Sequence, residues 1–346
     1  MPFTAADPIV HSVERFDAAI VGAGVIGLAC ALRAQQRGLR VCVLERGEPG
    51  SGATCAAAGV LAPDPETPGF TALARRAAEL WPAFADELGA VGYTRCGSLV
   101  LAFDDDAGDI AGEWLDAGAC RALEPGIAAD CTGGTLLVAD AQVDPRLVTA
   151  ALVQRVGDAL RTNADVVEAT PGAVVLADGS RIAADRVVLA AGAWASRRLA
   201  RRLPVRPVKG QTLRLRGPLP ATRIIRSEHV YVVPRASGET VVGATVEEAG
   251  YDETPTGEAT ELLLRQAVRA VPAVAELELV EEVASLRPGT PDDGPLIGEW
   301  EGLLVAGGHY RNGILLAPIT ADASAALLAG DAPPVETLPF DPKRFD

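Results

Sequence analysis

Two short apolar runs flank a helical pattern in residues 16–46, near the start of the chain. Residues 17–21 form a β-rich apolar run, and residues 40–44 form a second run that leads into Glu45. Between them the apolar positions recur with helical spacing as far as Gly38, a residue type that commonly ends helices. The pattern predicts a strand, a helix and a second strand, which together make one β-α-β unit.

Similar patterns divide the rest of the chain into alternating blocks. Helices are predicted at residues 70–88 with a break or kink at Pro82, and at residues 107–117, 144–160, 255–275 and 314–328. Apolar strands of the parallel type are predicted at residues 186–190 and 303–306. From Pro207 the pattern changes to antiparallel strands, with a hairpin at Ser237-Gly238.

The α/β pattern therefore occurs at the start, the middle and the end of the chain, with β-richer blocks between. We predict an α/β fold with a discontinuous Rossmann-like nucleotide-binding domain and a substrate domain built on a mixed or antiparallel sheet. The predicted boundaries are residues 14–92, 144–206 and 286–346 for the first domain, and residues 93–143 and 207–285 for the second.

Composition narrows the class of protein. The chain has 346 residues, of which 49% are hydrophobic, and a net charge of −15 argues against nucleic acid and anionic membranes as partners. Its six cysteines form no C-x-x-C pair, so we expect reduced thiols in a cytoplasmic protein and no metal site. No targeting signal is visible, and the uncharged run at residues 18–32 is shorter than the roughly 20 residues that span a bilayer.

A glycine motif lies at the first turn of the β-α-β unit. Gly22, Gly24 and Gly27 form G-x-G-x-x-G, a weak signal alone in a chain with 36 glycines. The strand, helix and strand around it strengthen the signal, as does Glu45 at the tip of the second strand. The glycines allow a tight turn and a close approach of a pyrophosphate to the helix N-terminus, and the acid can bind a ribose diol. The motif in this setting predicts dinucleotide binding.

The position of the later strands favours FAD over NAD. The first unit must be completed by strands near Val187 and Leu304, so the cofactor is held by segments far apart in the sequence. Glu45 favours FAD over FMN, because only FAD brings an adenosine ribose to that position. Residues 47–63 are rich in Gly, Ala and Thr, which suits a loop and a short helix against a flat ligand; a flexible surface loop is the alternative. Non-covalent binding is expected, because no Cys or His lies at a recognised flavin tether.

Six sequence blocks, in order along nearly the whole chain, resemble the glycine oxidase branch (thiazole-biosynthesis type) of the FAD-dependent D-amino-acid oxidase family. They read GAGVIGLACALRAQQRG, SGATCAAAGVLAP, PVKGQ, YVVPR-x-SGE-x-VVGAT, LRPGTPDDGPLIG and GHYRNGILLAP. The resemblance implies the D-amino-acid oxidase (glutathione-reductase-2) type of fold. It also implies that the segment around His309 to Leu315 lies along the flavin ring.

The resemblance also implies which residues hold the substrate. The arginine matching Arg287 binds the substrate carboxylate, the tyrosine matching Tyr231 donates its hydroxyl to the same group, and Arg311 lines the site near substrate and flavin. Guanidinium suits this task because it is a planar, permanently charged fork. The two histidines in these blocks, at positions 229 and 309, are interpreted as structural. Val246 and Tyr310 differ from the methionine and phenylalanine usual in the pattern, which leaves the preferred substrate open.

The expected cofactor-binding residues all come from the glycine motif, the residues around Glu45, the Ala-rich segment, two sheet positions and the last block. They are Gly22, Gly24, Val25, Ile26, Gly27, Glu45, Arg46, Ala53, Thr54, Ala58, Gly59, Val60, Val166, Gly192, Gly308, His309, Tyr310, Arg311, Asn312, Gly313, Ile314 and Leu315.

The activity implied by the resemblance is FAD-dependent oxidation of glycine or another small amine, such as sarcosine, D-alanine or D-proline. A hydride would pass from the α-carbon to the flavin without a side-chain base, O₂ would be reduced to H₂O₂, and the imine would serve thiamine biosynthesis. A homodimer or homotetramer and a thiazole synthase partner are implied as well. Two alternatives stay open: a dehydrogenase that passes electrons to a quinone or other carrier, and a non-catalytic flavoprotein.

Overall fold

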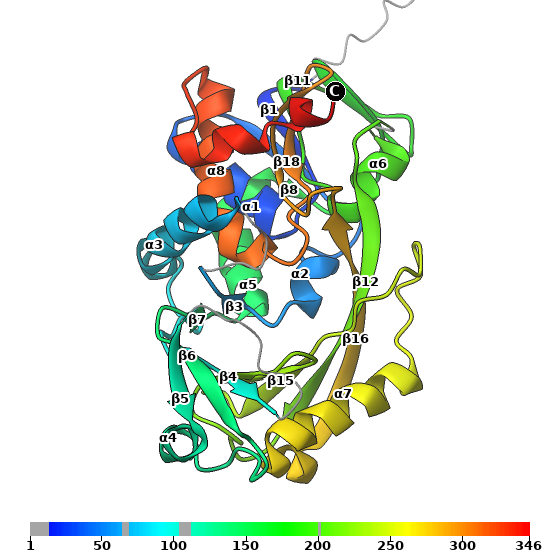
Figure 1. The fold of residues 1–346 in the computed structure, drawn as a ribbon. Coiled ribbons are helices and arrows are strands. Elements are labelled where there is room, and N and C mark those ends of the chain that lie inside the picture. Colours follow the sequence, from blue (N-terminus) through cyan, green and yellow to red (C-terminus); the bar gives the residue numbers. More distant parts are fainter. Residues whose placement is uncertain (1–13, 64–68, 104–111, 200–201) are drawn as a thin grey trace, which may run out of the picture.

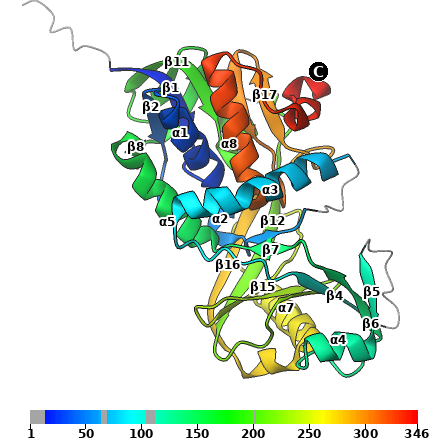
Figure 2. The same ribbon diagram turned by 90° about the vertical axis from the view of Figure 1, so that its left-hand side faces the viewer.

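The computed structural model describes residues 14–63, 69–103, 112–199 and 202–346. Two sheets of eight strands each dominate it, and they lie at opposite ends of an elongated molecule (Figure 1). The helices of one half cluster on the first sheet, whereas the second sheet carries α4 and α7 at the far end (Figure 2). The α/β fold with a mixed second sheet agrees with the prediction, whereas the exact domain boundaries stay a prediction.

The first sheet contains the predicted β-α-β unit. Its strand order is β17-β18-β11-β1-β2-β8, with β10 paired to β11 and β9 to β10. Its strands are β1 (Arg15–Val21), β2 (Val41–Leu44), β8 (Leu160–Arg161), β9 (Val166–Thr170), β10 (Ala173–Leu176), β11 (Arg181–Leu189), β17 (Leu296–Trp300) and β18 (Leu303–Gly307). Strand β11 runs parallel to both β1 and β18, with Val188 opposite Leu304. The completion of the sheet by distant segments is therefore confirmed.

Four helices cover one region of this sheet: α1 (Val25–Gln36), α3 (Thr71–Leu88), α5 (Pro145–Val156) and α8 (Gly313–Ala329). Helix α8 is apolar nearly all round and buried along most of its length, as expected for a helix enclosed by others. It packs on α1 and α3, and the indole Nε1 of Trp81 donates to the Leu315 carbonyl at 2.9 Å. At the start of α5, the carboxylate of Asp144 caps the helix by accepting from the Arg146 N–H at 2.9 Å.

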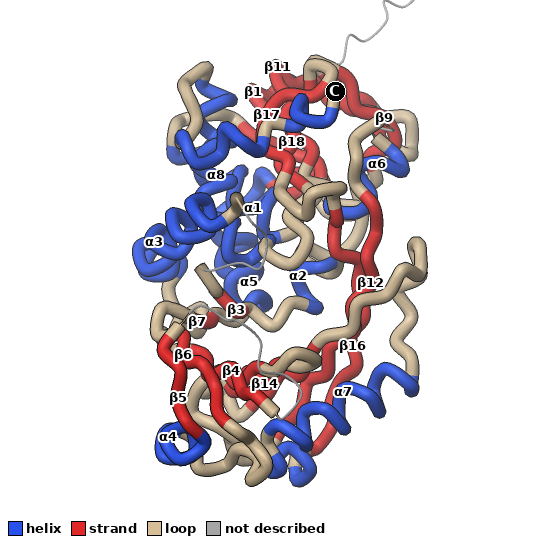
Figure 3. The backbone as a smooth tube through the Cα atoms, viewed as in Figure 1, coloured by secondary structure: helices blue, strands red, loops and turns tan. Residues whose placement is uncertain are grey.

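The second sheet has the order β16-β12-β15-β14-β13-β4-β6-β5. Its strands are β4 (Ser98–Ala102), β5 (Glu113–Asp116), β6 (Gly133–Leu137), β12 (Arg206–Arg216), β13 (Ile224–Arg226), β14 (Tyr231–Pro234), β15 (Glu239–Gly243) and β16 (Glu278–Gly289). Strands β12 and β16 pair along their whole length, from Arg206 opposite Gly289 to Arg216 opposite Glu278. This ribbon extends from the second sheet up to the first (Figure 3).

The remaining elements connect or cover the two sheets. The helices are α2 (Ala53–Ala56), α4 (Ala117–Leu123), α6 (Ala195–Arg198) and α7 (Gly257–Ala270), and β3 (Val60–Leu61) pairs with β7 (Ala141–Gln142). Helix α7 packs on β12 and β15. The contact is made through the hydrophobic core of the second sheet, which contains Leu213, Val242 and Leu263. None of the helices in the described part of the chain is both long and apolar enough to cross a membrane.

Several predicted elements need correction. The helix predicted at residues 107–117 is wrong where it is described, because residues 113–116 form β5, which pairs with β6; residues 107–111 lie outside the described residues. Helix α3 runs through Pro82 without a break, and α5 ends at Val156 because Gly157 takes a non-helical conformation with positive φ (φ 59°, ψ −137°). Strand β17 was not predicted.

Candidate active site

One large cavity lies between the two sheets and has a volume of about 1510 Å³. A cavity for a small molecule usually measures roughly 300–1,000 Å³. The extra space fits a dinucleotide cofactor together with a small substrate. The cavity begins at the glycine turn after β1, follows the Ala-rich segment, and reaches Arg287 and the start of α8.

Two of the three glycines in the turn leave no room for a side chain. Gly22 has φ 104°, and a Cβ there would lie 2.6 Å from the Ala190 carbonyl oxygen. A Cβ on Gly27 would lie 2.0 Å from the Gly22 carbonyl oxygen, which explains the third glycine of the motif as a packing requirement. Helix α1 then begins at Val25, whose N–H is bound by the Thr54 hydroxyl at 3.1 Å, and its N-cap residue Gly24 has no side chain to bind the next N–H groups. This end of the cavity fits a pyrophosphate, because backbone donors are available where bulk is excluded.

Glu45 lies beside the glycine turn at the end of β2. Its carboxylate accepts from the Ala23 N–H at 2.8 Å and from the Gly47 N–H at 3.0 Å. A carboxylate has about four acceptor positions, so it keeps capacity for ribose hydroxyls. The guanidinium carbon of neighbouring Arg46 lies 4.1 Å from the ring centroid of Trp194, which also lines the cavity. The predicted adenosine end of the cofactor site is therefore assembled in one place.

The last sequence block forms the opposite end of the cavity. Tyr310 has φ 46° and its N–H donates to the Pro288 carbonyl at 3.0 Å, so the turn before α8 packs against the end of β16. The buried His309 ring lies 3.0 Å from the Thr320 hydroxyl, and burial lowers the pKa of this histidine to about 3. His309 is therefore neutral at pH 7, in keeping with its interpretation as a structural residue.

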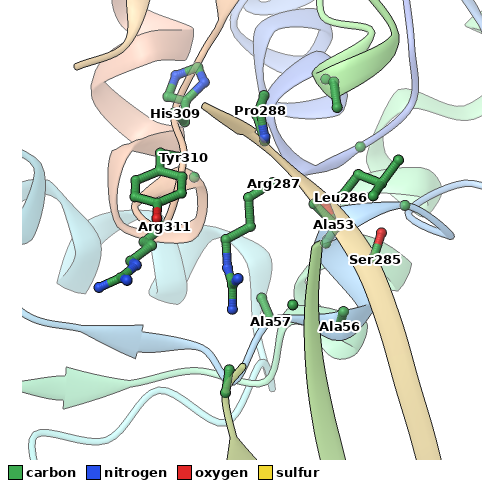
Figure 4. Close-up of a pocket in the computed structure, with 18 of the residues that line it drawn as sticks. Ala53, Ala56, Ala57, Ser285, Leu286, Arg287, Pro288, His309, Tyr310 and Arg311 are labelled. Carbon is green, nitrogen blue, oxygen red and sulfur yellow. The ribbon is translucent and has the colours of Figure 1, made fainter. Parts of the chain in front are cut away.

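Arg287 projects from β16 into the cavity and faces Tyr310 and Arg311 across it (Figure 4). Its Nη1 donates to the Thr245 carbonyl at 2.9 Å and to the Lys209 carbonyl at 3.3 Å. No carboxylate of the described residues lies within salt-bridge distance of this guanidinium. Burial is the main cause that lowers the pKa of Arg287. A partly buried cation held by carbonyls alone among the described residues has the chemistry to bind an anion.

Two glycines make room for these side chains. A Cβ on Gly210 of β12 would lie 2.1 Å from Arg287 Nη1, and a Cβ on Gly243 of β15 would lie 2.5 Å from the Tyr231 hydroxyl oxygen. We call Gly210 and Gly243 the glycine floor. Because neither glycine has a side chain, the guanidinium and the phenol can lie flat against the sheet at the base of the cavity.

Tyr231 begins β14 directly opposite Gly243. Burial is the main cause that raises the pKa of its hydroxyl, although the nearby Arg287 and Arg311 lower it. The phenol is therefore protonated at neutral pH and can donate a hydrogen bond. Arg287 and Tyr231 together present two kinds of donor to the same part of the cavity.

The structure brings most of the predicted site residues together. Arg287, Tyr231 and Arg311 all line the cavity, as do Glu45, Arg46, Val166 and Gly192 and most of the glycine motif, the Ala-rich segment and the last block. Three predicted cofactor residues lie behind the wall instead. Gly27 packs on the turn, Gly308 packs on Thr290, and Leu315 is buried in the core.

Other residues of the cavity were missed from the sequence. Glu247 and Glu253 line it, and their carboxylates accept from the hydroxyls of Thr245 at 2.6 Å and Ser285 at 3.0 Å, respectively. The site is therefore richer in carboxylates than expected. The glycine floor was missed as well, although both glycines lie inside blocks that carry the resemblance, PVKGQ and VVGAT. Among the described residues, no group of His, Cys, Asp and Glu is arranged to hold a metal ion.

Comparison with known proteins identifies relatives of this chain. Glycine oxidase from Geobacillus kaustophilus is 34% identical over 96% of this chain and 97% of its own length. A bifunctional protein ThiO/ThiG from Synechocystis is 36% identical, and this chain spans 54% of that protein's length. The chain thus covers about half of its bifunctional relatives and nearly all of the glycine oxidases.

Solved structures show the same likeness. The crystal structure of glycine oxidase from Geobacillus kaustophilus superposes with a TM-score of 0.89 at 33% identity, covering 95% of this chain and 98% of that one. Iminodiacetate oxidase from Chelativorans superposes with a TM-score of 0.84 at 26% identity, covering 94% of this chain and 98% of that one. The family model described as FAD dependent oxidoreductase (DAO) matches residues 17–327. The chain therefore belongs to the DAO family of FAD-dependent oxidoreductases.

Proposed function

We propose that this protein oxidises small amino acids, with glycine as the first candidate and sarcosine, D-alanine and D-proline as others. One observation carries the proposal: the partly buried Arg287 guanidinium has carbonyl partners but no carboxylate partner among the described residues. A substrate carboxylate would supply the missing charge. The glycine oxidase relatives, which match this chain over nearly their full length, support an amine next to that carboxylate.

The positions of the side chains support a role for each in this proposal. Arg287 binds the carboxylate through the part of its fork that the Lys209 and Thr245 carbonyls do not use, and Tyr231 donates its O–H to the same group. Arg311 adds a second positive charge across the cavity. These contacts hold the α-carbon in place, so that orientation rather than proton abstraction carries the rate.

Bound FAD would supply the chemistry that side chains lack, accepting a hydride from the α-carbon and passing two electrons to O₂ to give H₂O₂. The substrate leaves as an imine, which water hydrolyses to an oxo acid and ammonia. The neutral His309 and the hydrogen-bonded Glu247 are not required to remove a proton from the α-carbon, because the nitrogen lone pair forms the new C=N bond.

Anaerobic reduction is the test. The yellow protein is mixed with each of the four amines in turn, the oxidised flavin band is followed, and air is then admitted. Bleaching by glycine or sarcosine with fast recovery and peroxide is the expected result. Bleaching with slow recovery would favour the dehydrogenase, and bleaching by none of them would overturn the proposal. The Arg287→Ala protein is the matched control, because it should hold flavin but bleach far more slowly.

We also propose that the imine is used for the thiazole of thiamine in the cytoplasm, alongside a thiazole synthase. The bifunctional ThiO/ThiG relatives support this. Their names join ThiO and ThiG in one protein, and this chain spans about half of its length. The gene should restore growth without thiamine to a bacterium that lacks its own glycine oxidase. Failure of an active protein to do so would contradict this role. A homodimer or homotetramer is part of the proposal, to be measured by light scattering.

A further inference from the structure

Two more arginines are buried where the second sheet meets the Ala-rich segment at residues 53–59. Arg214 on β12 is fully buried, and Arg235 after β14 is 6% exposed. Their guanidiniums share one carboxylate oxygen, Glu239 Oε1, at 2.6 Å from Arg214 and 2.8 Å from Arg235. Arg235 also pairs with Asp144, the cap of α5, at 2.7 Å. Burying two cations is costly, so their remaining contacts call for an explanation.

Those contacts are with the backbone of the segment. Arg214 Nη2 donates to the Cys55 carbonyl at 2.7 Å, and Arg235 Nη2 donates to the Ala58 carbonyl at 3.0 Å. Between them, the Thr212 hydroxyl donates to the Ala56 carbonyl at 3.0 Å. Three side chains of the second sheet therefore hold three carbonyls within four successive residues. We call Thr212, Arg214 and Arg235 the carbonyl-binding set.

The other side of the segment lines the cavity. Ala53, Ala56 and Ala57 lie opposite Arg287 and Leu286 (Figure 4), and the Thr54 hydroxyl accepts from the Val25 N–H at 3.1 Å, at the start of α1. Alanine and glycine side chains bury little surface, and a helix as short as α2 has few internal hydrogen bonds. The segment thus depends on partners outside itself to keep its position.

We propose that the carbonyl-binding set positions this segment against FAD, so that cofactor affinity depends on two arginines that do not line the cavity. Arginine suits the task because one terminal nitrogen can bind a carboxylate while the other binds a carbonyl; lysine has a single nitrogen and cannot hold both at these separations. The proposal rests on the family's cofactor and not on the proposed substrate, so its failure would leave the amine oxidase assignment intact.

The test compares two arginine-to-lysine variants. Arg214→Lys keeps the charge near Glu239 but loses the bond to Cys55, whereas Arg223→Lys alters another pair, with the buried Glu124 at 2.8 Å, that does not involve the segment. The Kd for FAD is measured by titrating the apoprotein, and the visible circular dichroism of the bound flavin is recorded. We expect an at least tenfold higher Kd and a changed dichroism for Arg214→Lys, and a Kd within twofold of the parent for Arg223→Lys. Equal Kd values for the two variants would overturn the proposal.

A second pair of variants, each a threonine-to-valine substitution, provides the test if Arg214→Lys does not fold. Thr212→Val removes only the hydroxyl that binds Ala56. Thr240→Val removes an equally buried hydroxyl for which the described residues offer no hydrogen-bond partner. The Kd for FAD should rise three- to fivefold in the first and stay unchanged in the second. If Thr212→Val lowers the melting temperature of the apoprotein but leaves the Kd for FAD unchanged, the set is merely structural and the proposal fails.

Discussion

The two ends of the cavity are built in different ways. At the nucleotide end, backbone groups and one carboxylate from residues 22–47 form most of the site, and glycines exclude side chains from it. At the substrate end, side chains from β14, β16 and the turn before α8 converge, and their partners lie far away in the sequence. The first end is therefore set by a local motif, whereas the second is set by the register of an antiparallel sheet. Substitutions at the two ends should separate cofactor binding from substrate binding.

Arg287→Ala should give the largest change and affect only the substrate end. Losing a charge-assisted contact costs about 2–4 kcal/mol, which corresponds to a roughly 30- to 1,000-fold fall in kcat/KM for glycine. The flavin should stay bound, as its visible spectrum would show. An unchanged kcat/KM would show that the carboxylate is bound elsewhere.

Gly210→Ala tests the glycine floor. Its new Cβ would lie 2.1 Å from Arg287 Nη1, so the guanidinium must move, and a shift of about 1 Å should raise KM for glycine about 10- to 100-fold. Gly257→Ala, where a Cβ meets no atom within 4 Å, is the control. If the KM values of the two variants agree, the floor does not position Arg287.

Glu45→Gln should act at the nucleotide end alone. The neutral amide loses charge-assisted bonds to the Ala23 and Gly47 N–H groups, and we expect roughly tenfold weaker FAD binding. At saturating FAD the KM for glycine should stay within twofold. Glu48→Gln, an exposed neighbour, serves as the control in the same titration. A large change in KM with unaltered FAD affinity would contradict the separation of the two ends.

His309 provides the smallest effect, on stability. Its pKa of about 3 in the folded protein lies below the ordinary value of 6.5, so the unfolded chain binds more protons between these limits. Folding stability should then fall as pH decreases from 6.5 toward 3, and it is fully present above 6.5. In His309→Gln this contribution vanishes. The free energy of unfolding, measured with urea, should therefore fall by about 2 kcal/mol less between pH 7 and pH 5 than it does in the parent protein. Identical losses in both proteins would show that His309 is not buried in its neutral form.

Prediction from sequence succeeded where the residues that define a structural element lie close together along the chain. The β-α-β unit, Glu45 and the completion of the sheet near Leu304 follow from local patterns and were found. Arg287, Tyr231 and Arg311 were assigned through resemblance, because nothing local links them. The glycine floor and Glu247 were missed for a physical reason: a glycine's importance depends on which side chain crosses it, and that is fixed by strand register.

The long ribbon of β12 and β16 has a consequence for motion. Its strands pair from one end to the other with a single register shift between Arg214 and Leu215. The ribbon starts beside the first sheet and continues into the second, and it carries Arg287 near its upper end. Rotation of one half against the other would have to bend this ribbon and break its ladder of hydrogen bonds. We therefore expect substrate to enter and product to leave through rearrangement of loops that line the cavity, on the nanosecond to microsecond timescale of loop motion, while the two sheets keep a fixed angle.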